Sequence, residues 1–181
     1  MNHRDLAIRH SRTVTFVISA RNEERIIDRS VLLLHEHLAA RMAPGSWRIL
    51  VAENGSTDGT AVQAARLVQQ FPDTIAAQSI PEAGRGNVFR AVARAHPEDT
   101  LCFIDADLPL PLDTIKQFLL PLNDADIVVG RRREPTHRPL LRRAMSWCWG
   151  HLVRILFDLS LHDPQCGILA QSGPCVRRMS W

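Results

Sequence analysis

Two aspartates follow directly on an apolar run in the stretch LCFIDADLPLP, residues 101–111. Asp105 and Asp107 are one residue apart, so their carboxylates repel each other unless a cation or hydrogen bonds compensate the charge. A hard divalent cation such as Mg²⁺ or Mn²⁺, shared with substrate phosphates, is suited to such a pair. A structural alternative is a capping turn, because aspartate is also favoured in turns and Pro109 follows here.

A second candidate site lies in ENGSTDGT, residues 53–60, where the acid Glu53 is followed by small residues. Such a turn lets backbone N–H groups approach a nucleotide or a phosphate closely. A carboxylate at Glu53 can accept hydrogen bonds from a base or a ribose hydroxyl. Asn-Gly and Asp-Gly are also common turn dipeptides, so this motif alone is unspecific.

The stretch GRGN, residues 84–87, places Arg85 between two glycines at the expected start of a helix. A cation in this position fits a diphosphate or a ribose, although an exposed arginine in an ordinary loop explains the same residues. A further acidic turn, DPQCG, occupies residues 163–167. The free Cys166 in that turn is more typical of packing than of chemistry.

These motifs follow expected strands in a chain where strands and helices alternate. Apolar, β-branched runs predict strands over residues 13–19, 47–52, 74–80, 101–104 and 125–130. Helical spacing predicts helices over residues 26–41, 59–71, 84–95, 112–122 and 139–159. This alternation is typical of an α/β three-layer sandwich with a mainly parallel sheet. Ligands bind at the carboxyl ends of such strands, where SARNEE, ENGSTDGT, DADLP and GRRR are expected.

The composition is that of an ordinary globular protein. The 181 residues are 45% apolar and 23% charged, which argues against disorder and predicts one domain over residues 1–181. Four cysteines without metal-type spacing favour a reducing cytosol. The chain has no signal peptide and no run of about eighteen apolar residues that would span a membrane. We therefore expect a cytoplasmic protein, at most peripheral at the cytoplasmic face of the membrane.

Positive charge gathers in one segment. Residues 131–154 hold seven arginines against one acid, Glu134, whereas the whole chain has a net charge of only +3. Such a local field suits an anionic ligand or an anionic membrane surface, and a solvated helix face is the plainer alternative. Apolar residues around Trp147 and Trp149 would seat this segment against a bilayer or lie in the core. We expect no nucleic-acid partner.

In their order and spacing, these motifs resemble the family 2 glycosyltransferases, which bind nucleotide sugars on a Rossmann-like α/β fold called GT-A. The resemblance is carried by VTFVISARNEE (14–24), VAENGSTDGT (51–60), GRGNVFRAVARA (84–95), CFIDADLPLP (102–111), DIVVGRRR (126–133) and DPQCGILA (163–170). The last segments are similar to polyprenyl-phosphate sugar transferases of the dolichyl-phosphate glucosyltransferase and dolichol-phosphate mannose synthase types.

The resemblance implies a metal-dependent hexosyltransferase with a UDP-glucose or GDP-mannose type of donor, a polyprenyl-phosphate acceptor and inversion at the sugar carbon. Its catalytic positions correspond to Asp105, Asp107, Asp163 and Gln165, of which Asp105 and Asp107 would hold Mg²⁺ or Mn²⁺. Its donor positions correspond to Ala20, Glu23, Glu53, Asn54, Gly84, Arg85, Asp105 and Ala106, with Arg85 in place of a usual lysine. The acceptor side corresponds to Arg131, and the basic residues Arg142 and Arg143 are expected beside it.

The sequence also departs from the family pattern. Ser19 and Arg21 stand where proline and an aromatic residue are usual, and Leu169 replaces a basic residue. Pro109 stands where some relatives carry a polar side chain that contacts the metal. The chain ends at Trp181, where relatives continue, so we expect a domain without the usual C-terminal helical segment. Two alternatives follow: transfer to a soluble sugar or polyol hydroxyl, and a non-catalytic fragment that only binds nucleotide sugars.

Overall fold

The central strand β1 (Val14–Ala20) pairs in parallel with β2 (Trp47–Glu53) on one side and β4 (Thr100–Asp105) on the other. The β3 strand (Ile75–Ser79) extends the sheet beyond β2 in the same direction. The β6 strand (Ile168–Gln171) runs antiparallel to β4, and β5 (Ile127–Val129) lies at the outer edge. The sheet order is therefore β3-β2-β1-β4-β6-β5, which confirms the predicted α/β class with a mainly parallel sheet.

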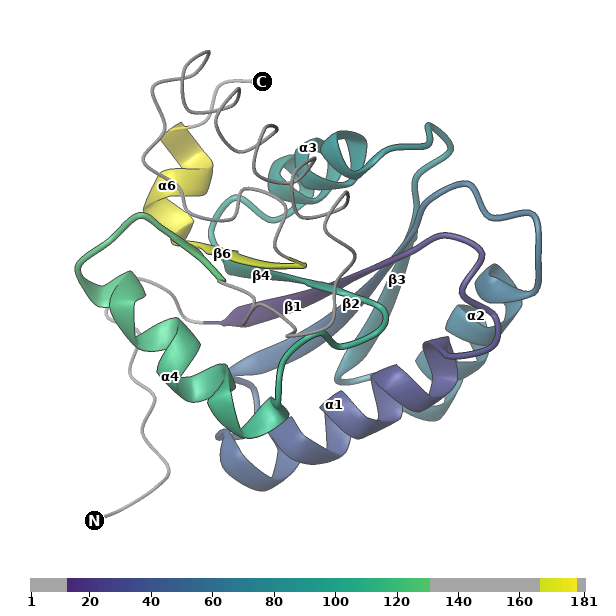
Figure 1. Ribbon diagram of the computed structural model, residues 1–181, viewed down its shortest axis with the longest axis horizontal. Helices are drawn as coiled ribbons and strands as arrows, with labels where there is room; N and C mark the ends of the chain where they lie inside the picture. Colours follow the sequence, from purple (N-terminus) through teal and green to yellow (C-terminus); the bar gives the residue numbers. More distant parts are fainter. Residues whose placement is uncertain (1–12, 131–166, 179–181) are drawn as a thin grey trace, which may run out of the picture. The chain divides into compact units, whose positions relative to one another are not determined.

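Helices cover both faces of this sheet in the computed structural model (Figure 1). On one face lie α1 (Ile27–Arg41), α2 (Thr60–Gln70) and α4 (Ile115–Leu119), and on the other lie α3 (Arg85–Ala95) and α6 (Gly173–Arg178). Val17 of β1 packs in one buried cluster with Phe103 of β4 and Val92 of α3. Because both faces are covered, the strands are continuous apolar runs rather than alternating ones.

The structure describes residues 13–130 and 167–178. Chain contacts divide the protein into two compact units, residues 1–128 with 167–181 and residues 129–166, and almost all described elements belong to the first. The helix predicted over residues 139–159 and the basic segment lie outside the described residues. Within the described residues, no helix combines the length and apolarity needed to cross a bilayer. The single domain expected over residues 1–181 stays a prediction.

Two regions differ from the sequence prediction, residues 112–123 and the residues after 167. The helix predicted over residues 112–122 is broken into a 3₁₀ turn (Leu112–Thr114), α4, and a second 3₁₀ turn (Leu120–Asn123). Pro121 lies at the start of that second turn, where its missing N–H would interrupt a longer α-helix. The apolar stretch after residue 167 forms β6, which the periodicity did not identify as a strand because it has only four residues.

A polar network joins three segments at the amino ends of the central strands. Arg48 of β2 donates from Nε to Thr15 Oγ1 at 2.8 Å and from Nη2 to His96 Nδ1 at 2.7 Å. It also forms an ion pair with Asp99, which accepts a 2.7 Å hydrogen bond from Thr15 Oγ1. Burial lowers the pKa of His96, the charge of Arg48 lowers it further, and Asp99 opposes the change.

The network predicts a pH dependence of stability. Because folding lowers the pKa of His96, the unfolded chain takes up a proton at a higher pH than the folded chain does. Protonation therefore favours unfolding, and stability is lost as the pH falls below the ordinary pKa of histidine. His35 and His37 are shifted in the same direction, also mainly by burial. The urea concentration at the midpoint of unfolding should therefore decrease as the pH is lowered from about 7.5 to about 5.5. The decrease should be smaller in His96→Asn.

An asparagine at this position keeps an acceptor for Arg48 but cannot take up a proton. The exposed Asp73→Asn is the matched control and should leave the pH dependence of the midpoint unchanged. Equal slopes in the wild type and His96→Asn would contradict a role for this histidine.

Candidate functional site

A cleft of about 350 Å³ opens at the carboxyl ends of β1, β2 and β4. It is lined by Ser19, Arg21, Glu23, Asn54, Gly84, Arg85, Asp105, Ala106 and Asp107. Seven of these residues were predicted from the sequence as catalytic or donor-binding. They meet because parallel neighbours end at the same edge of a sheet, and Ser19 pairs in register with both Ala52 and Asp105.

The aspartate pair stands where β4 ends. Asp105 donates its backbone N–H to the carbonyl of Gly167 at 2.9 Å, and its carboxylate forms a 3.0 Å ion pair with Arg85. Asp107 is exposed, and no described residue forms an ion pair with it. Leu108 closes the turn by donating its N–H to the carbonyl of Asp105 at 3.0 Å.

This turn is strained. Leu108 has a φ of 48°, in the left-handed region that bulky side chains rarely adopt. Such conformations persist only where the surrounding structure enforces them, and they gather at functional sites. The strain at Leu108 therefore favours a functional turn over the plain capping turn that the sequence left open.

The side chain of Asn54 holds the β3–α3 loop beside the cleft by two hydrogen bonds, which together form a clamp on the loop. This side chain is 4% exposed, and its Oδ1 accepts the N–H of Gly84 at 2.7 Å. Its Nδ2 donates to the carbonyl of Glu82 at 2.8 Å. Gly84 has a φ of 130°, which a residue with a side chain would adopt only under strain. Asn54, predicted as a donor-binding residue, thus fixes the loop that carries Arg85.

The β1–α1 and β2–α2 turns are joined by reciprocal hydrogen bonds. Asn22 Oδ1 accepts the N–H of Thr57 at 2.8 Å, and the N–H of Asn22 donates to Ser56 Oγ at 3.1 Å. Glu24 accepts the N–H of Gly59 at 3.0 Å. These bonds hold the two turns together as one wall beside the cleft.

Glu53, predicted to contact the nucleobase, is 6% exposed and does not line the cleft. Its carboxylate accepts hydrogen bonds from the N–H of Ser56 and from Ser79 Oγ. Burial raises the pKa of Glu53, but the bonds from Ser56 and Ser79 outweigh burial and leave the pKa below its ordinary value. Glu53 therefore stays ionised and shapes its own turn. Ala20 is fully buried beside it in the sheet.

Glu23 brings a third acid into the cleft. Burial raises the pKa of Glu23, and the negative charges of Asp107, Asp58 and Asp105 raise it further. Within the described residues, however, no group of three or more His, Cys, Asp or Glu side chains is arranged to hold a metal ion. The cleft thus combines three acids with two arginines, and the aspartate pair is its candidate set of metal ligands among the described residues.

Some predicted site residues lie outside the described residues: Asp163, Gln165, Arg131, Arg142 and Arg143. Two lining residues, Ser19 and Arg21, were not predicted as binding residues. Their position at the end of an expected strand, level with the aspartate pair, was the available signal. The sequence had marked them only as departures from the family pattern.

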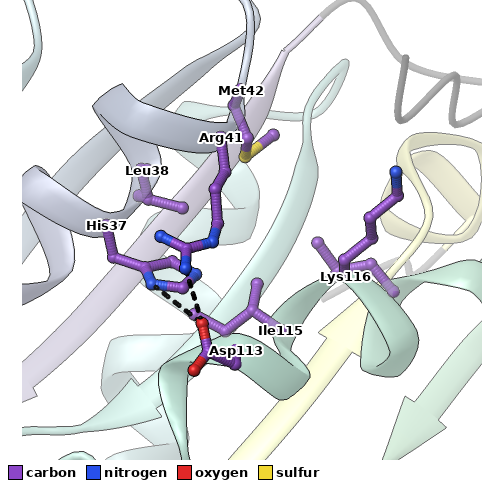
Figure 2. Close-up of a pocket in the computed structure, with 8 residues that line it drawn as sticks. His37, Leu38, Arg41, Met42, Asp113, Ile115 and Lys116 are labelled. Atoms are coloured by element: carbon purple, nitrogen blue, oxygen red, sulfur yellow. Dashed lines mark hydrogen bonds and ion pairs between the residues drawn. The ribbon is translucent and has the colours of Figure 1, made fainter. Parts of the chain in front are cut away.

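A second hollow of similar size, about 360 Å³, lies between α1 and α4 (Figure 2). His37 and Arg41 of α1 point toward Asp113 there, and Arg41 forms a 2.8 Å ion pair with it. The remaining walls are largely apolar, with Leu38, Ile115 and Leu119. The volumes of the two hollows therefore do not indicate which of them is the functional site. Only the cleft combines an aspartate pair with arginines at the strand ends.

Comparison with known proteins agrees with this geometry. Residues 15–172 match the model of the family described as glycosyl transferase family 2. The chain is 29% identical over 164 residues to the glycosyltransferase AglD of Haloferax volcanii, covering 88% of this chain and 26% of that protein. It is 26% identical over 181 residues to a dodecaprenyl-phosphate galacturonate synthase of Rhizobium johnstonii, covering 92% of this chain and 49% of that protein.

A solved structure shows the same fold. The glucosyl-3-phosphoglycerate synthase of Mycobacterium tuberculosis, in complex with Mn²⁺, UDP-glucose and phosphoglyceric acid, superposes with a TM-score of 0.66 at 24% identity. The likeness covers 93% of this chain and 59% of that one. The chain thus spans less than two thirds of each of these proteins. With the GT-A fold established and the family match running over residues 15–172, the chain belongs to glycosyl transferase family 2.

Proposed function

We propose that this chain carries the donor site of a metal-dependent, inverting glycosyltransferase that moves a hexose from a nucleoside-diphosphate sugar to a polyprenyl phosphate. The observation that carries the proposal is the cleft at the strand ends, where Asp105 and Asp107 face the same space as Arg85. Family membership supports the reaction class. A polyprenyl-phosphate acceptor is supported by the name of the Rhizobium relative.

The aspartate pair fits Mg²⁺ or Mn²⁺. Carboxylate oxygens are the ligands these hard cations prefer, and Asp107 is exposed in the cleft. Pro109 has no ligand atom in its side chain, so the diphosphate and water would complete the coordination. When bound, the cation would stabilise the negative charge that develops on the leaving diphosphate. Asp105 and Asp107 would hold it, and Arg85 would bind a phosphate oxygen beside it.

The acceptor determines whether the enzyme needs a general base. A polyprenyl phosphate is already an anion near neutral pH, so no residue has to remove a proton from it. The arginines of residues 131–154 would hold that phosphate, and the apolar side chains of the same segment would contact a membrane surface.

A soluble hydroxyl acceptor is the second candidate. A hydroxyl needs a base, and Glu23 is an acid in the cleft whose pKa is raised by burial and by neighbouring carboxylates. A raised pKa makes a carboxylate a stronger base than an ordinary glutamate. A third possibility is a module that binds the donor without catalysis.

Asp107→Asn tests the donor site. The change removes one carboxylate charge without adding bulk, so we expect transfer to fall about a hundredfold or more. Mn²⁺-dependent thermal stabilisation by UDP-glucose or GDP-mannose should also disappear, since only specific binding raises the melting temperature. The matched control is Asp113→Asn in the second hollow, where the carboxylate is 77% exposed. If Asp107→Asn retained both donor binding and transfer, the proposal would be wrong.

Gly167→Ala tests the packing behind Asp105. A Cβ at this position would lie 2.5 Å from Asp105 Oδ2 and 2.9 Å from Pro109 Cγ, so the carboxylate must move. We expect a loss of about 1–3 kcal/mol in unfolding free energy, measured in urea, and weaker Mn²⁺-dependent donor binding. Gly86→Ala is the control, because its Cβ meets no atom within 4 Å. It should be neutral or stabilise by up to about 1 kcal/mol. A Gly167→Ala protein as stable and as active as Gly86→Ala would contradict this role.

Charge reversal tests the acceptor. An Arg142→Glu/Arg143→Glu protein should lose about tenfold or more in transfer to polyprenyl phosphate, because hydrogen-bonded phosphate contacts are strong. Its donor binding should not change. Arg29→Glu/Arg66→Glu, on exposed positions of α1 and α2, is the matched control. Unchanged turnover would instead favour a soluble acceptor, which a panel that includes phosphoglyceric acid would reveal. Donor binding without transfer to any acceptor would favour the non-catalytic module.

A further inference from the structure

We propose that Arg85 is a built-in counter-cation for Asp105 in the donor-free protein, so that a divalent cation binds the cleft more weakly alone than together with the diphosphate. The inference rests on the proposed function and adds a coupling between cation and diphosphate to it. Arg85 is then a positioning residue whose release removes one partner from Asp105.

Each carboxylate oxygen of Asp105 has a close neighbour in the protein. Oδ1 lies 3.0 Å from Nη2 of Arg85. Oδ2 lies against Gly167, so closely that a Cβ on that glycine would come within 2.5 Å of it. A cation that approaches Asp105 therefore meets a guanidinium at one oxygen and a packed backbone at the other. Asp107 is left as the exposed carboxylate of the pair.

The position of Arg85 is set by a buried side chain rather than by chance. Asn54 is 4% exposed and uses its two amide groups on the loop, accepting from the N–H of Gly84 at 2.7 Å and donating to the carbonyl of Glu82 at 2.8 Å. Arg85 is the first residue of α3, directly after this clamp. The clamp fixes the loop backbone from which the side chain of Arg85 extends.

Charge determines which ligand can displace Arg85. A divalent cation alone repels the guanidinium but must break its ion pair to gain the second carboxylate. A diphosphate offers Arg85 new acceptor oxygens, and a planar guanidinium binds phosphate with two parallel hydrogen bonds. The exchange keeps Arg85 paired throughout, and it removes the guanidinium from Asp105 when the diphosphate and its cation arrive together.

The first experiment measures binding of Mn²⁺ alone by electron paramagnetic resonance. Arg85→Gln should raise the affinity for Mn²⁺ about twofold to fivefold, as expected for loss of a partly exposed ion pair. Arg85→Lys keeps a cation at this position and should bind Mn²⁺ as the wild type does. Arg90→Gln is the matched control on the same helix, where the exposed arginine bonds to Asn87. It should also leave the affinity unchanged.

The second experiment repeats the titration with UDP or GDP present. Here Arg85→Gln should lower the affinity for the Mn²⁺–nucleotide pair about tenfold, because a charge-assisted phosphate contact is lost. The same substitution thus acts in opposite directions on the two ligands, which a general loosening of the fold would not produce. Asn54→Ala should raise the affinity for Mn²⁺ alone as Arg85→Gln does, although Arg85 is still present.

The two titrations test the role of Arg85 and the proposed function separately. An unchanged or weaker affinity for Mn²⁺ alone in a folded Arg85→Gln protein overturns the role of Arg85. If UDP and GDP bind to no variant while Arg85→Gln still binds Mn²⁺ more tightly, the proposed function and the coupling to the diphosphate fail, and only the pairing of Arg85 with Asp105 against the cation stands. Circular dichroism of each variant establishes that it is folded before either comparison is made.

Discussion

The site depends above all on the parallel pairing of β1 with both of its neighbours. Each residue of this strand has a partner in β2, and Val14 to Ser19 also have partners in β4. Phe16, Val17 and Ile18 are fully buried between the helical layers, so a slip by one residue would exchange the side chains on its two faces. Close packing against both helical layers therefore fixes the register, and the register sets Ser19 beside Asp105 at the edge of the cleft.

The polar residues at this edge of the sheet divide into buried ones that bond to the protein and exposed ones that face the cleft. Glu53 and Asn54 carry the polar groups expected of ligands, yet hydrogen bonds within the protein already use them. Buried polar groups are costly without partners, and here those partners are the loops that surround the cleft. The exposed Asp107 is left to interact with a ligand. The inner polar residues thus hold the walls, and the outer ones face the open space.

Much of the fold could be predicted from the sequence because the strands are long apolar runs between helical segments. The first four strands and the first three helices lie within a few residues of their predicted positions. The four-residue β6 and the six-residue α6 were too short to show a period. The alignment of polar strand ends in a parallel sheet also predicted that the turns with Asn54 and Asp105 would meet at one edge, and the resemblance to the family added Arg85 to that site.

The direction of each side chain could not be predicted in the same way. Residue types suggested that Glu53 contacts a nucleobase, but its orientation depends on Ser79, which is 26 positions away in the chain. The ion pair between Arg85 and Asp105 likewise joins two motifs that the sequence presents separately. Such contacts depend on loop conformations, including the positive φ at Gly84, which a pattern of residue types does not specify.

The electrostatics of the cleft explain why these contacts matter for function. Glu23, Asp105 and Asp107 all face it, and the pKa of Glu23 is raised first by burial and then by the neighbouring negative charges. The arginines of the cleft offset part of this negative charge, and Arg85 does so through its ion pair with Asp105. If the cleft binds a cation and a diphosphate as proposed, these acids and the arginines that line it are the groups whose charges the ligands would complement. The strained turn at Leu108 follows directly on the two aspartates, so its conformation bears on how they are arranged.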